Sequence, residues 1–450
     1  MGGAGLIARL ALILAWLAGS LLWLSADRLI RDGDEEGHVG AAELLMHTLT
    51  EDGLLPFLAA SFAGDLGEYP PLYPAAVAAW WALHGGQPGA VVVRAINLLW
   101  PLIAALSCGA IARRLSLSSL PVVAAVLLIP GVCGLSRHFM PEGMLVAAVS
   151  LAALLALQAS EAPGWRRAAV LGGVLGLGCL IKQTFILYTL PLALWALWRL
   201  RIRGVATITV ATIVAGPWYL THLSEQARYG SQSLQTTDPG WLLTLAYYPI
   251  VGVASELGVV LAAAVLLGLR QASPEQRRLI GLWVGLSLAL LVLTPRKYPR
   301  LLVPLLPLVV IWIGAVARSR PQQVALVGLA GIVVGVASLI TLPSPPLVER
   351  VDDGCRQRWL RPPVSEDFGL QAVAAAARQR QATVVSVLDS PDIPCSVQTT
   401  HRWIDHLQPY LRREGIEAAV VEEPISGALI IDWSGGSHDS PLLGRRFDIR

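Results

Sequence analysis

One short acidic run in the sequence has the residue types needed for proton transfer. It is Arg-Asp-Gly-Asp-Glu-Glu-Gly-His at residues 31–38, and it follows an apolar stretch at 6–25. A general base requires a carboxylate within hydrogen-bond reach of a hydroxyl or amine, and neighbouring carboxylates can also hold a divalent cation. The carboxylates of this run, which include Asp34 and Glu35, are therefore candidates for a base or a metal ligand, and His38 is a candidate to line the same cavity. The alternative is a solvated loop that ends the preceding helix, and metal binding stays open.

A second candidate carboxylate, Glu142, lies in the segment Arg-His-Phe-Met-Pro-Glu-Gly at residues 137–143. At the start of a helix its charge favours the positive end of the helix dipole, which is a purely structural role. The alternative is a catalytic carboxylate that faces the first acidic run. Arg137, in the same segment, is then a candidate cation for the phosphate of a bound donor.

The lysines are unusual because they account for only two of the 34 basic residues. Lys182 lies between two apolar segments, in a turn too short to need a charge for solubility. Its ammonium group can snorkel to the membrane surface or bind a phosphate, and we favour the phosphate. Lys297 lies with Arg296 and Arg300 just before another apolar stretch. These cations can anchor that helix or bind an anion, and we favour the anion.

Tyrosines accompany these charges. The segment Glu-Tyr-Pro-Pro-Leu-Tyr-Pro at 68–74 is rigid, because each proline fixes φ and restricts the residue before it. This pattern is typical of a tight turn, and it is equally suited to bracing a site. We therefore expect Tyr69 and Tyr73 to line the cavity, together with Tyr298 beside Lys297.

The elements that position these residues are predicted to be membrane helices. Hydrophobic residues make up 54% of the 450 residues and the mean hydropathy is +0.59. Charged residues make up 14%, against about 25% in a soluble domain. These values exclude one large water-soluble enzyme, and the many Leu, Val, Ile and Trp residues exclude a disordered chain. The net charge of +3 is too small to indicate nucleic-acid binding.

The apolar segments predict a polytopic helical bundle, since a span needs about 20 apolar residues. With the N-terminus in the cytoplasm, arginines lie at every inner turn, as the positive-inside rule requires. Segment 72–84 is short and holds a Trp pair, so we place it at the membrane interface. We expect about eleven transmembrane helices, at 6–25, 91–111, 119–135, 143–159, 168–181, 183–198, 204–221, 241–268, 279–294, 301–317 and 322–341.

The charges divide the chain into two parts. Residues 1–342 carry 22 basic and 16 acidic groups, whereas residues 343–450 carry 12 and 15. The first part is predicted to be the transmembrane domain, with a long first outer loop at 26–90. Residues 343–364 are rich in Pro and Arg and are predicted to form a linker. Residues 365–450 then form a soluble domain outside the cytoplasm.

The C-terminal part is predicted to be a small α/β domain, because predicted strands and helices alternate along it. An oxidising compartment would permit a disulfide between Cys355 and Cys395, its only two cysteines. The predicted elements are helices at 366–380 and 401–415 and strands at 383–389, 416–423 and 428–434.

These segments together resemble the polyprenyl-phosphate-dependent glycosyltransferases of the GT-C superfamily. Within it they resemble bacterial homologues of the protein O-mannosyltransferases and of the lipid A aminoarabinose transferase. Each motif is short, but their order and spacing are moderately specific over about residues 20–315. The matching residues are Asp34-Glu35, Gly53, Pro70-Pro71-Leu72, Arg94, Glu142 after Arg137, Lys182, Pro217-Trp218-Tyr219, and Lys297 with Arg300 before Leu301–Pro307.

The resemblance implies a mainly α, GT-C-like bundle whose first outer loop carries the catalytic Asp, with interfacial helices over a cavity open to lipid. It implies Asp34 as the base or acceptor-orienting group, and Lys182 with the cations at 296–300 as contacts to the donor's phosphate. Two positions depart from the family pattern. Glu142 stands where Asp is more common, and His38 stands where an aromatic residue is usual.

The expected reaction moves a sugar from a polyprenyl-phosphate donor to a protein, lipid or glycan acceptor, with inversion at the anomeric carbon. It takes place at the extracytoplasmic face of a bacterial-type cytoplasmic membrane. Cations hold the departing phosphate and a carboxylate takes the acceptor's proton. One alternative is a polytopic transporter or lipid flippase, for which Glu256 is the candidate intramembrane charge. Another is a non-catalytic subunit of cell-envelope assembly.

Overall fold

The computed structural model divides into two units. Unit 1 comprises Met1–Leu22, His38–Ile340 and Trp359–Arg361, and unit 2 comprises Trp23–Gly37, Thr341–Arg358 and Pro362–Arg450. The structure describes residues 3–27, 33–62, 69–85, 90–234, 245–294, 299–316, 320–338, 360, 363, 369–388, 407, 410–411, 415–433, 438–440 and 445–449.

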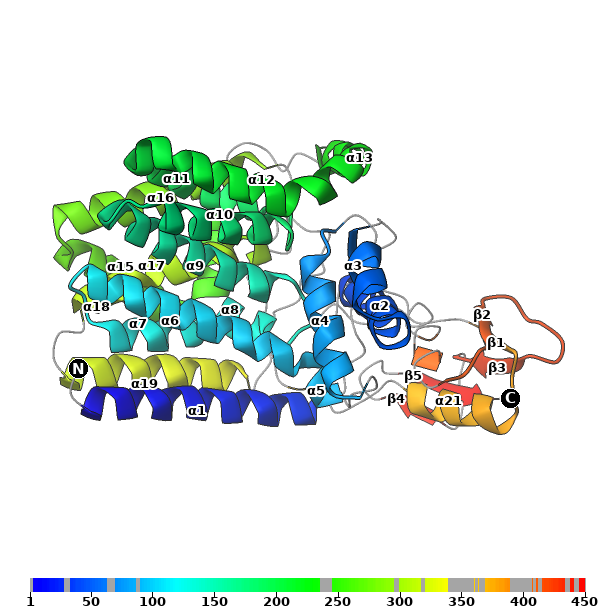
Figure 1. The fold of residues 1–450 in the computed structure, drawn as a ribbon. Coiled ribbons are helices and arrows are strands. Elements are labelled where there is room, and N and C mark those ends of the chain that lie inside the picture. Colours follow the sequence, from blue (N-terminus) through cyan, green and yellow to red (C-terminus); the bar gives the residue numbers. More distant parts are fainter. Residues whose placement is uncertain are drawn as a thin grey trace. The chain divides into compact units, whose positions relative to one another are not determined.

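Helices dominate the described residues (Figure 1). The first are α1 (Gly3–Ala26), α2 (Gly33–His47), η1 (Thr48–Asp52), α3 (Leu54–Phe62), α4 (Leu72–Leu83), α5 (Ala90–Ala95), η2 (Ile96–Leu98), α6 (Leu99–Arg114), α7 (Ser119–Leu127), α8 (Pro130–Leu135) and α9 (Glu142–Glu161). Next come α10 (Trp165–Cys179), α11 (Phe185–Leu200), η3 (Arg201–Arg203), α12 (Gly204–Thr221), α13 (Leu223–Leu234), η4 (Tyr247–Leu257), α15 (Val259–Gln271) and α16 (Pro274–Leu293). The last are η5 (Pro299–Leu305), α17 (Leu306–Val309), η6 (Val310–Trp312), α18 (Ile313–Val316), α19 (Arg320–Ala337) and α21 (Leu370–Gln379).

The prediction of a mainly helical membrane protein with a small C-terminal sheet is confirmed. Six helical stretches among the described residues are long and apolar enough to cross a membrane. The predicted number of spans, eleven, stays a prediction. The six stretches are Gly5–Ala26, Val91–Arg114, Glu142–Glu161, Phe185–Thr221, Pro274–Leu293 and Pro299–Val316.

Two predicted spans are interrupted, and in each case the local backbone supplies the reason. The segment 119–135 divides into α7 and α8 because Ile129, which precedes Pro130, is held in an extended conformation. The segment 241–268 divides at Gly258, whose φ of +78° favours glycine and ends η4 before α15 begins. These breaks bring irregular backbone into the bundle, which apolar periodicity alone did not predict.

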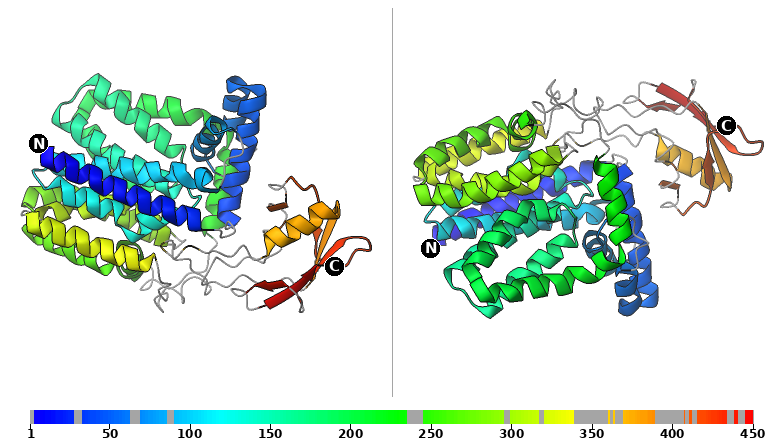
Figure 2. Two further views of the ribbon diagram at one scale, coloured as in Figure 1. Left: turned by 90° about the horizontal axis from the view of Figure 1, so that it is seen from below. Right: turned by 90° about the horizontal axis from the view of Figure 1, so that it is seen from above.

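Helix α9 lies at the centre of the unit 1 bundle, where it packs against α6, α10 and α11. Helix α10 packs closely on α12, and Figure 2 shows the bundle from two further sides. This close approach requires glycine at two positions one turn apart, because a Cβ at Gly172 or Gly176 would collide with backbone atoms of α12. Small residues at such spacing let membrane helices approach each other closely.

Helix α4 runs crosswise to α6 and α9 at one end of the bundle (Figure 1). This is the orientation expected of a helix that lies along a membrane surface. Its start is held by a backbone hydrogen bond from Leu72 N to Leu180 O of 2.9 Å. Farther along, the indole N–H groups of Trp80 and Trp81 donate to the carbonyls of Val92 and Val93 at 2.8 and 3.3 Å. The crossing helix therefore covers the end of the bundle at which α9 begins.

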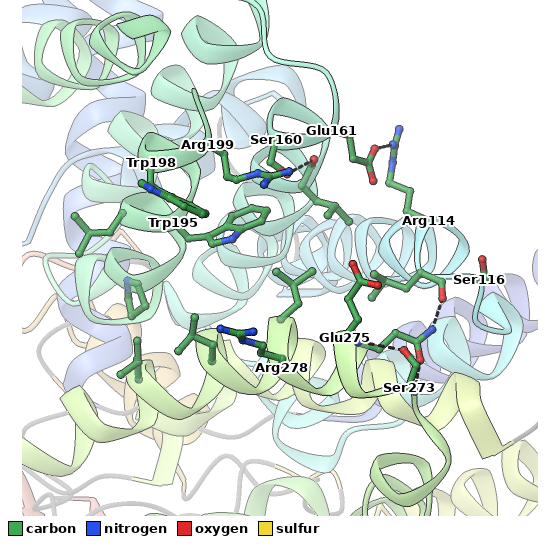
Figure 3. Close-up of a pocket in the computed structure, with 18 residues that line it drawn as sticks. Arg114, Ser116, Ser160, Glu161, Trp195, Trp198, Arg199, Ser273, Glu275 and Arg278 are labelled. Carbon is green, nitrogen blue, oxygen red and sulfur yellow. Dashed lines mark hydrogen bonds and ion pairs between the residues drawn. The ribbon is translucent and has the colours of Figure 1, made fainter. Parts of the chain in front are cut away.

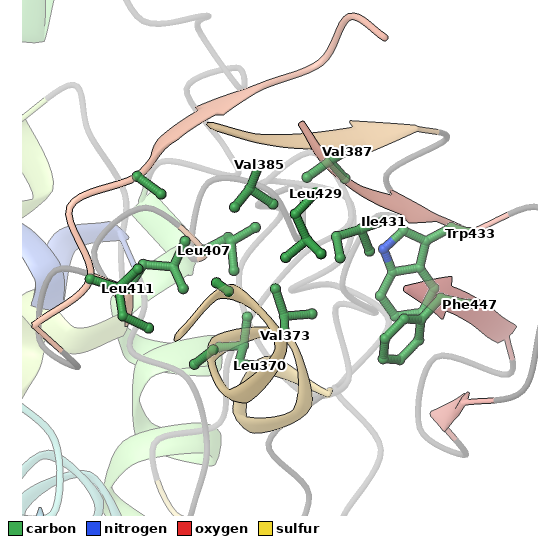
Figure 4. Close-up of a cluster of buried hydrophobic side chains, with 14 residues drawn as sticks. Leu370, Val373, Val385, Val387, Leu407, Leu411, Leu429, Ile431, Trp433 and Phe447 are labelled. Atoms are coloured by element: carbon green, nitrogen blue, oxygen red, sulfur yellow. The ribbon is translucent and has the colours of Figure 1, made fainter. Parts of the chain in front are cut away.

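Unit 2 contains a five-stranded sheet with the strand order β2-β1-β3-β5-β4. Strand β1 is parallel to β2 and β3, whereas β5 is antiparallel to β3 and β4. Helix α21 packs one face against the sheet, because Leu370, Val373, Ala374 and Ala377 recur at helical spacing and are buried (Figure 4). The strands are β1 (Val384–Leu388), β2 (Ala419–Val421), β3 (Leu429–Asp432), β4 (His438–Ser440) and β5 (Arg445–Ile449).

The predicted α/β character of the C-terminal part is therefore confirmed, although β4 and β5 were not predicted. The predicted strands at 383–389, 416–423 and 428–434 correspond to β1, β2 and β3. The predicted linker lies outside the described residues except for Leu360 and Pro363. Most of the predicted helix at 401–415 and both cysteines of the predicted disulfide, Cys355 and Cys395, also lie outside them.

Candidate active site

A buried ion pair joins two of the predicted site residues. Glu142 is the first residue of α9, and Lys182 lies in the short turn between α10 and α11. Lys182 Nζ donates to Glu142 Oε1 at 2.6 Å, and the two residues are only 5% and 1% exposed. Lys182 therefore does not snorkel to the surface, and the pair places a charged site inside the bundle.

Arg300 completes this cluster from a third part of the chain. Its Nε lies 3.6 Å from the same Glu142 oxygen, and its side chain is partly buried at 16% exposure. Arg300 is held near the pair because Tyr188 of α11 donates a 2.8 Å hydrogen bond to the carbonyl of the next residue, Leu301. The cluster thus brings two cations to one carboxylate, and two neighbouring cations can attract an anion such as a phosphate.

The second carboxylate oxygen of Glu142 has a different environment. Oε2 is buried and accepts no hydrogen bond from the residues that the structure describes. Buried polar oxygens are nearly always hydrogen-bonded in folded proteins. This oxygen is therefore suited to accept a hydrogen bond from a hydroxyl or water in the site.

Aromatic rings form a wall beside Lys182. Its Nζ lies 5.6 Å from the centre of the Tyr69 ring, a distance that permits a cation–π interaction. The His38 ring lies 5.0 Å from the Tyr69 ring and 5.5 Å from the Tyr73 ring. Three residues predicted to line the cavity therefore lie together, next to the predicted phosphate-binding lysine.

A hydrogen-bonded amide supports this wall from behind. Asn97 accepts a 3.2 Å hydrogen bond from the Tyr73 hydroxyl and donates a 2.8 Å hydrogen bond to the carbonyl of His138. It links α4 to the segment that precedes α9. Sequence reasoning did not identify Asn97, although a signal existed, because it is the only asparagine in the chain and lies in an apolar stretch.

Arg137 is buried but makes a different contact from the one we predicted. Its Nη1 donates to the Ser338 hydroxyl at 3.1 Å, while Arg94 donates to its backbone carbonyl at 3.5 Å. Among the described residues, it forms no ion pair with Glu142. Its assignment as a phosphate ligand stays a prediction that these contacts do not support.

The remaining predicted residues lie in unit 2 or outside the described residues. Asp34 and Glu35 lie in the first turn of α2 and belong to unit 2, and Glu35 is buried. The side chain of Asp34 lies outside the described residues, as do Arg296, Lys297 and Tyr298. Among the described residues, no three His, Cys, Asp or Glu side chains gather in a way that could hold a metal ion.

Comparison with known proteins connects this geometry to one class of membrane protein. The family described as dolichyl-phosphate-mannose-protein mannosyltransferase matches residues 68–220, a range that includes Tyr69, Glu142 and Lys182. Undecaprenyl phosphate-alpha-4-amino-4-deoxy-L-arabinose arabinosyl transferase 1 from Pseudomonas fluorescens is 27% identical over 202 residues. That stretch covers 38% of this chain and 35% of the relative, so the matched part spans about a third of the relative's length.

Solved structures extend the likeness to nearly the whole chain. ArnT from Cupriavidus metallidurans in the apo state has a TM-score of 0.58 at 16% identity, covering 96% of this chain and 94% of that one. The structure of the same protein bound to undecaprenyl phosphate has a TM-score of 0.57 at 14% identity, and it also covers 96% of this chain and 94% of that one. The Archaeoglobus fulgidus oligosaccharyltransferase complex with zinc and sulfate has a TM-score of 0.52 at 10% identity, covering 92% of this chain and 62% of that one. The chain therefore has the fold of ArnT, and the resemblance drawn from its sequence is confirmed.

Proposed function

We propose that this chain is a membrane glycosyltransferase that moves a sugar from a polyprenyl-phosphate donor to an acceptor. The observation that carries the proposal is the buried Glu142–Lys182 pair with Arg300 on the same carboxylate oxygen. This cluster lies at the end of the apolar helices α9 and α11, where a lipid's phosphate group meets the bundle. The family match and the fold of ArnT, solved with undecaprenyl phosphate, support this class of donor.

The proposed reaction is a single displacement. The acceptor atom bonds to the anomeric carbon as the bond from that carbon to the phosphate oxygen breaks, so the configuration inverts. The polyprenyl phosphate leaves with the electron pair of the broken bond, and Lys182 and Arg300 stabilise its developing charge. The acceptor's proton passes to a carboxylate, which we assign to Asp34 with Glu35 beside it, because the resemblance implies an acidic residue of the first loop.

Glu142 has a separate role in this proposal. Both cations approach its Oε1, so the carboxylate fixes the position of the groups that bind phosphate. Pre-positioned cations need no reorganisation as charge develops on the leaving group. We therefore propose Glu142 as a positioning residue for Lys182 and Arg300, whereas the sequence prediction had made it a catalytic carboxylate.

The orientation in the membrane completes the proposal. We place the cluster and the first loop at the extracytoplasmic face of a bacterial-type cytoplasmic membrane, with the N-terminus in the cytoplasm. The arginines at predicted inner turns support this direction. The acceptor is a protein, a lipid or a glycan that reaches this face.

Donor binding can be tested with undecaprenyl phosphate as the probe. We expect Lys182→Gln and Arg300→Gln each to weaken its binding to purified protein about tenfold or more, because each removes a hydrogen bond to a charged group. Arg166→Gln is the matched control, since Arg166 is exposed and lies near the opposite end of the bundle, beside the start of α10. Unchanged binding in both site variants, with intact thermal unfolding profiles, would contradict the phosphate assignment.

Catalysis requires a separate test. A strain lacking this protein, complemented with Asp34→Asn, should lack the glycan that wild type restores, as measured by mass spectrometry of envelope glycans. Full product from that variant would remove Asp34 from the mechanism. Undecaprenyl phosphate binding without any glycan difference between wild-type and deletion strains would favour a lipid flippase instead.

A further inference from the structure

A pocket lies at the end of the bundle opposite Glu142. It has a volume of about 990 Å³, which is within the usual range for ligand pockets. Its walls are the C-terminal ends of α6, α9 and α11 and the first turns of α16 (Figure 3). Helix α9 has 20 residues, so at 1.5 Å per residue its two ends are about 30 Å apart. The pocket is therefore distinct from the candidate active site.

Three arginines and two glutamates, Glu161 and Glu275, line this pocket, so its charged side chains carry a net positive charge. Arg114 forms an ion pair with Glu161. Arg199 and Arg278 are exposed and lie on opposite walls in Figure 3, and neither forms an ion pair with another described residue. The helix dipole explains Arg199, which lies in the last turn of α11. Arg278 lies near the start of α16, where the helix dipole does not favour a cation, and the positive-inside rule accounts for an arginine at this turn.

Apolar side chains line the same pocket. Trp195 and Trp198 reach it from α11, and Leu282 and Leu286 reach it from α16. Trp198 is 71% exposed and the two leucines are each 47% exposed. Tryptophan is enriched where a membrane helix meets the headgroup region. Cations next to an exposed apolar wall match the two parts of a lipid, its charged headgroup and its acyl chain.

We propose that this pocket binds an anionic phospholipid, with Arg199 and Arg278 contacting its phosphate and an acyl chain lying against Leu282 and Leu286. Basic pockets between membrane helices recognise such headgroups by charge. The proposal does not depend on the glycosyltransferase assignment, because the pocket shares no residue with the Glu142 cluster.

The test uses the full chain in nanodiscs of phosphatidylcholine doped with phosphatidylglycerol, with retained lipid read by native mass spectrometry. We expect the double variant Arg199→Gln/Arg278→Gln to weaken phosphatidylglycerol retention about 25-fold, since each cation near an anionic headgroup changes the affinity about fivefold. The matched control is Arg203→Gln/Arg277→Gln. It removes the same charge from neighbouring exposed positions that do not line the pocket.

Each outcome supports or overturns the proposal. Selective loss in the Arg199/Arg278 variant, with retention in the control, supports it. Equal loss in both variants shows only general attraction to the membrane surface and overturns it. If the wild-type protein retains phosphatidylcholine as well as it retains phosphatidylglycerol, the proposal is overturned too. Displacement of phosphatidylglycerol by inorganic phosphate or by decaprenyl phosphate identifies a free anion or a polyprenyl lipid as the ligand, and each of these overturns the assignment to a phospholipid.

Discussion

The two ends of the helical bundle in unit 1 differ in whether their charged residues are buried or exposed. At one end, Lys182 and Glu142 are buried, paired with each other and covered by the Tyr69 ring. At the other end, Arg199 and Arg278 are exposed, and the pair Arg114–Glu161 lies on the surface. A buried charge needs a fixed partner, whereas an exposed one is solvated and can exchange partners. This difference is consistent with the two proposals, which assign donor positioning to the first end and binding of a charged headgroup to the second.

The largest expected effect comes from breaking the buried pair. Lys182→Met should lower the free energy of unfolding in detergent by about 3–5 kcal/mol, because it removes the lysine that is hydrogen-bonded to the buried Glu142 carboxylate and leaves Arg300 as its remaining cation among the described residues. The double variant Glu142→Leu/Lys182→Met should recover most of that loss, because it removes both charges of the pair. If the double variant loses as much stability as the two single variants together, the two side chains are not coupled.

An intermediate effect is expected at the support behind the aromatic wall. Asn97→Leu removes the partner of the Tyr73 hydroxyl and the donor to the His138 carbonyl, and should cost about 1–3 kcal/mol. Tyr73→Phe removes only one of these two bonds and should cost less. Thermal or chemical unfolding of both variants in detergent measures the difference. A Tyr73→Phe variant as unstable as Asn97→Leu would place the stabilising contact elsewhere on the tyrosine.

The smallest expected effect is at the exposed end. Arg114→Gln breaks the surface pair with Glu161 and should change the free energy of unfolding by about 0–1 kcal/mol, since water replaces the lost partner. The same unfolding measurement applies. A loss as large as that of Lys182→Met would show that the two ends do not differ in how they hold charge.

The pattern of apolar segments predicted the fold well where structure is local. Hydropathy located the helical stretch Val91–Arg114 and the helices α9 and α16 to within about five residues, and alternation of elements identified β1 and α21. Prediction failed where the backbone is irregular. The break at Gly258 depends on a positive φ, and a Cβ added there would lie 3.3 Å from Pro130; hydropathy carries no information about either.

The site was predicted only in part. The rarity of lysine identified Lys182, and the proline-rich turn identified Tyr69 and Tyr73, which do lie beside it or in its wall. The ion pair between Lys182 and Glu142 was not predicted. The contact of the Arg137 guanidinium with Ser338, 201 positions away along the chain, was not predicted, and the phosphate-binding role of Arg137 stays a prediction.

The amino-acid sequence by itself determined that this is a polytopic membrane protein. Apolar composition and span length are local properties of the sequence, and they decide which segments can cross a bilayer. It also identified which charges are exceptional. Only the tertiary structure decided that Lys182 holds Glu142, 40 residues earlier, and that Arg300 joins them. Such contacts depend on how α9, α10, α11 and η5 pack, and packing is set by side-chain shape across distant segments rather than by the period of any one of them.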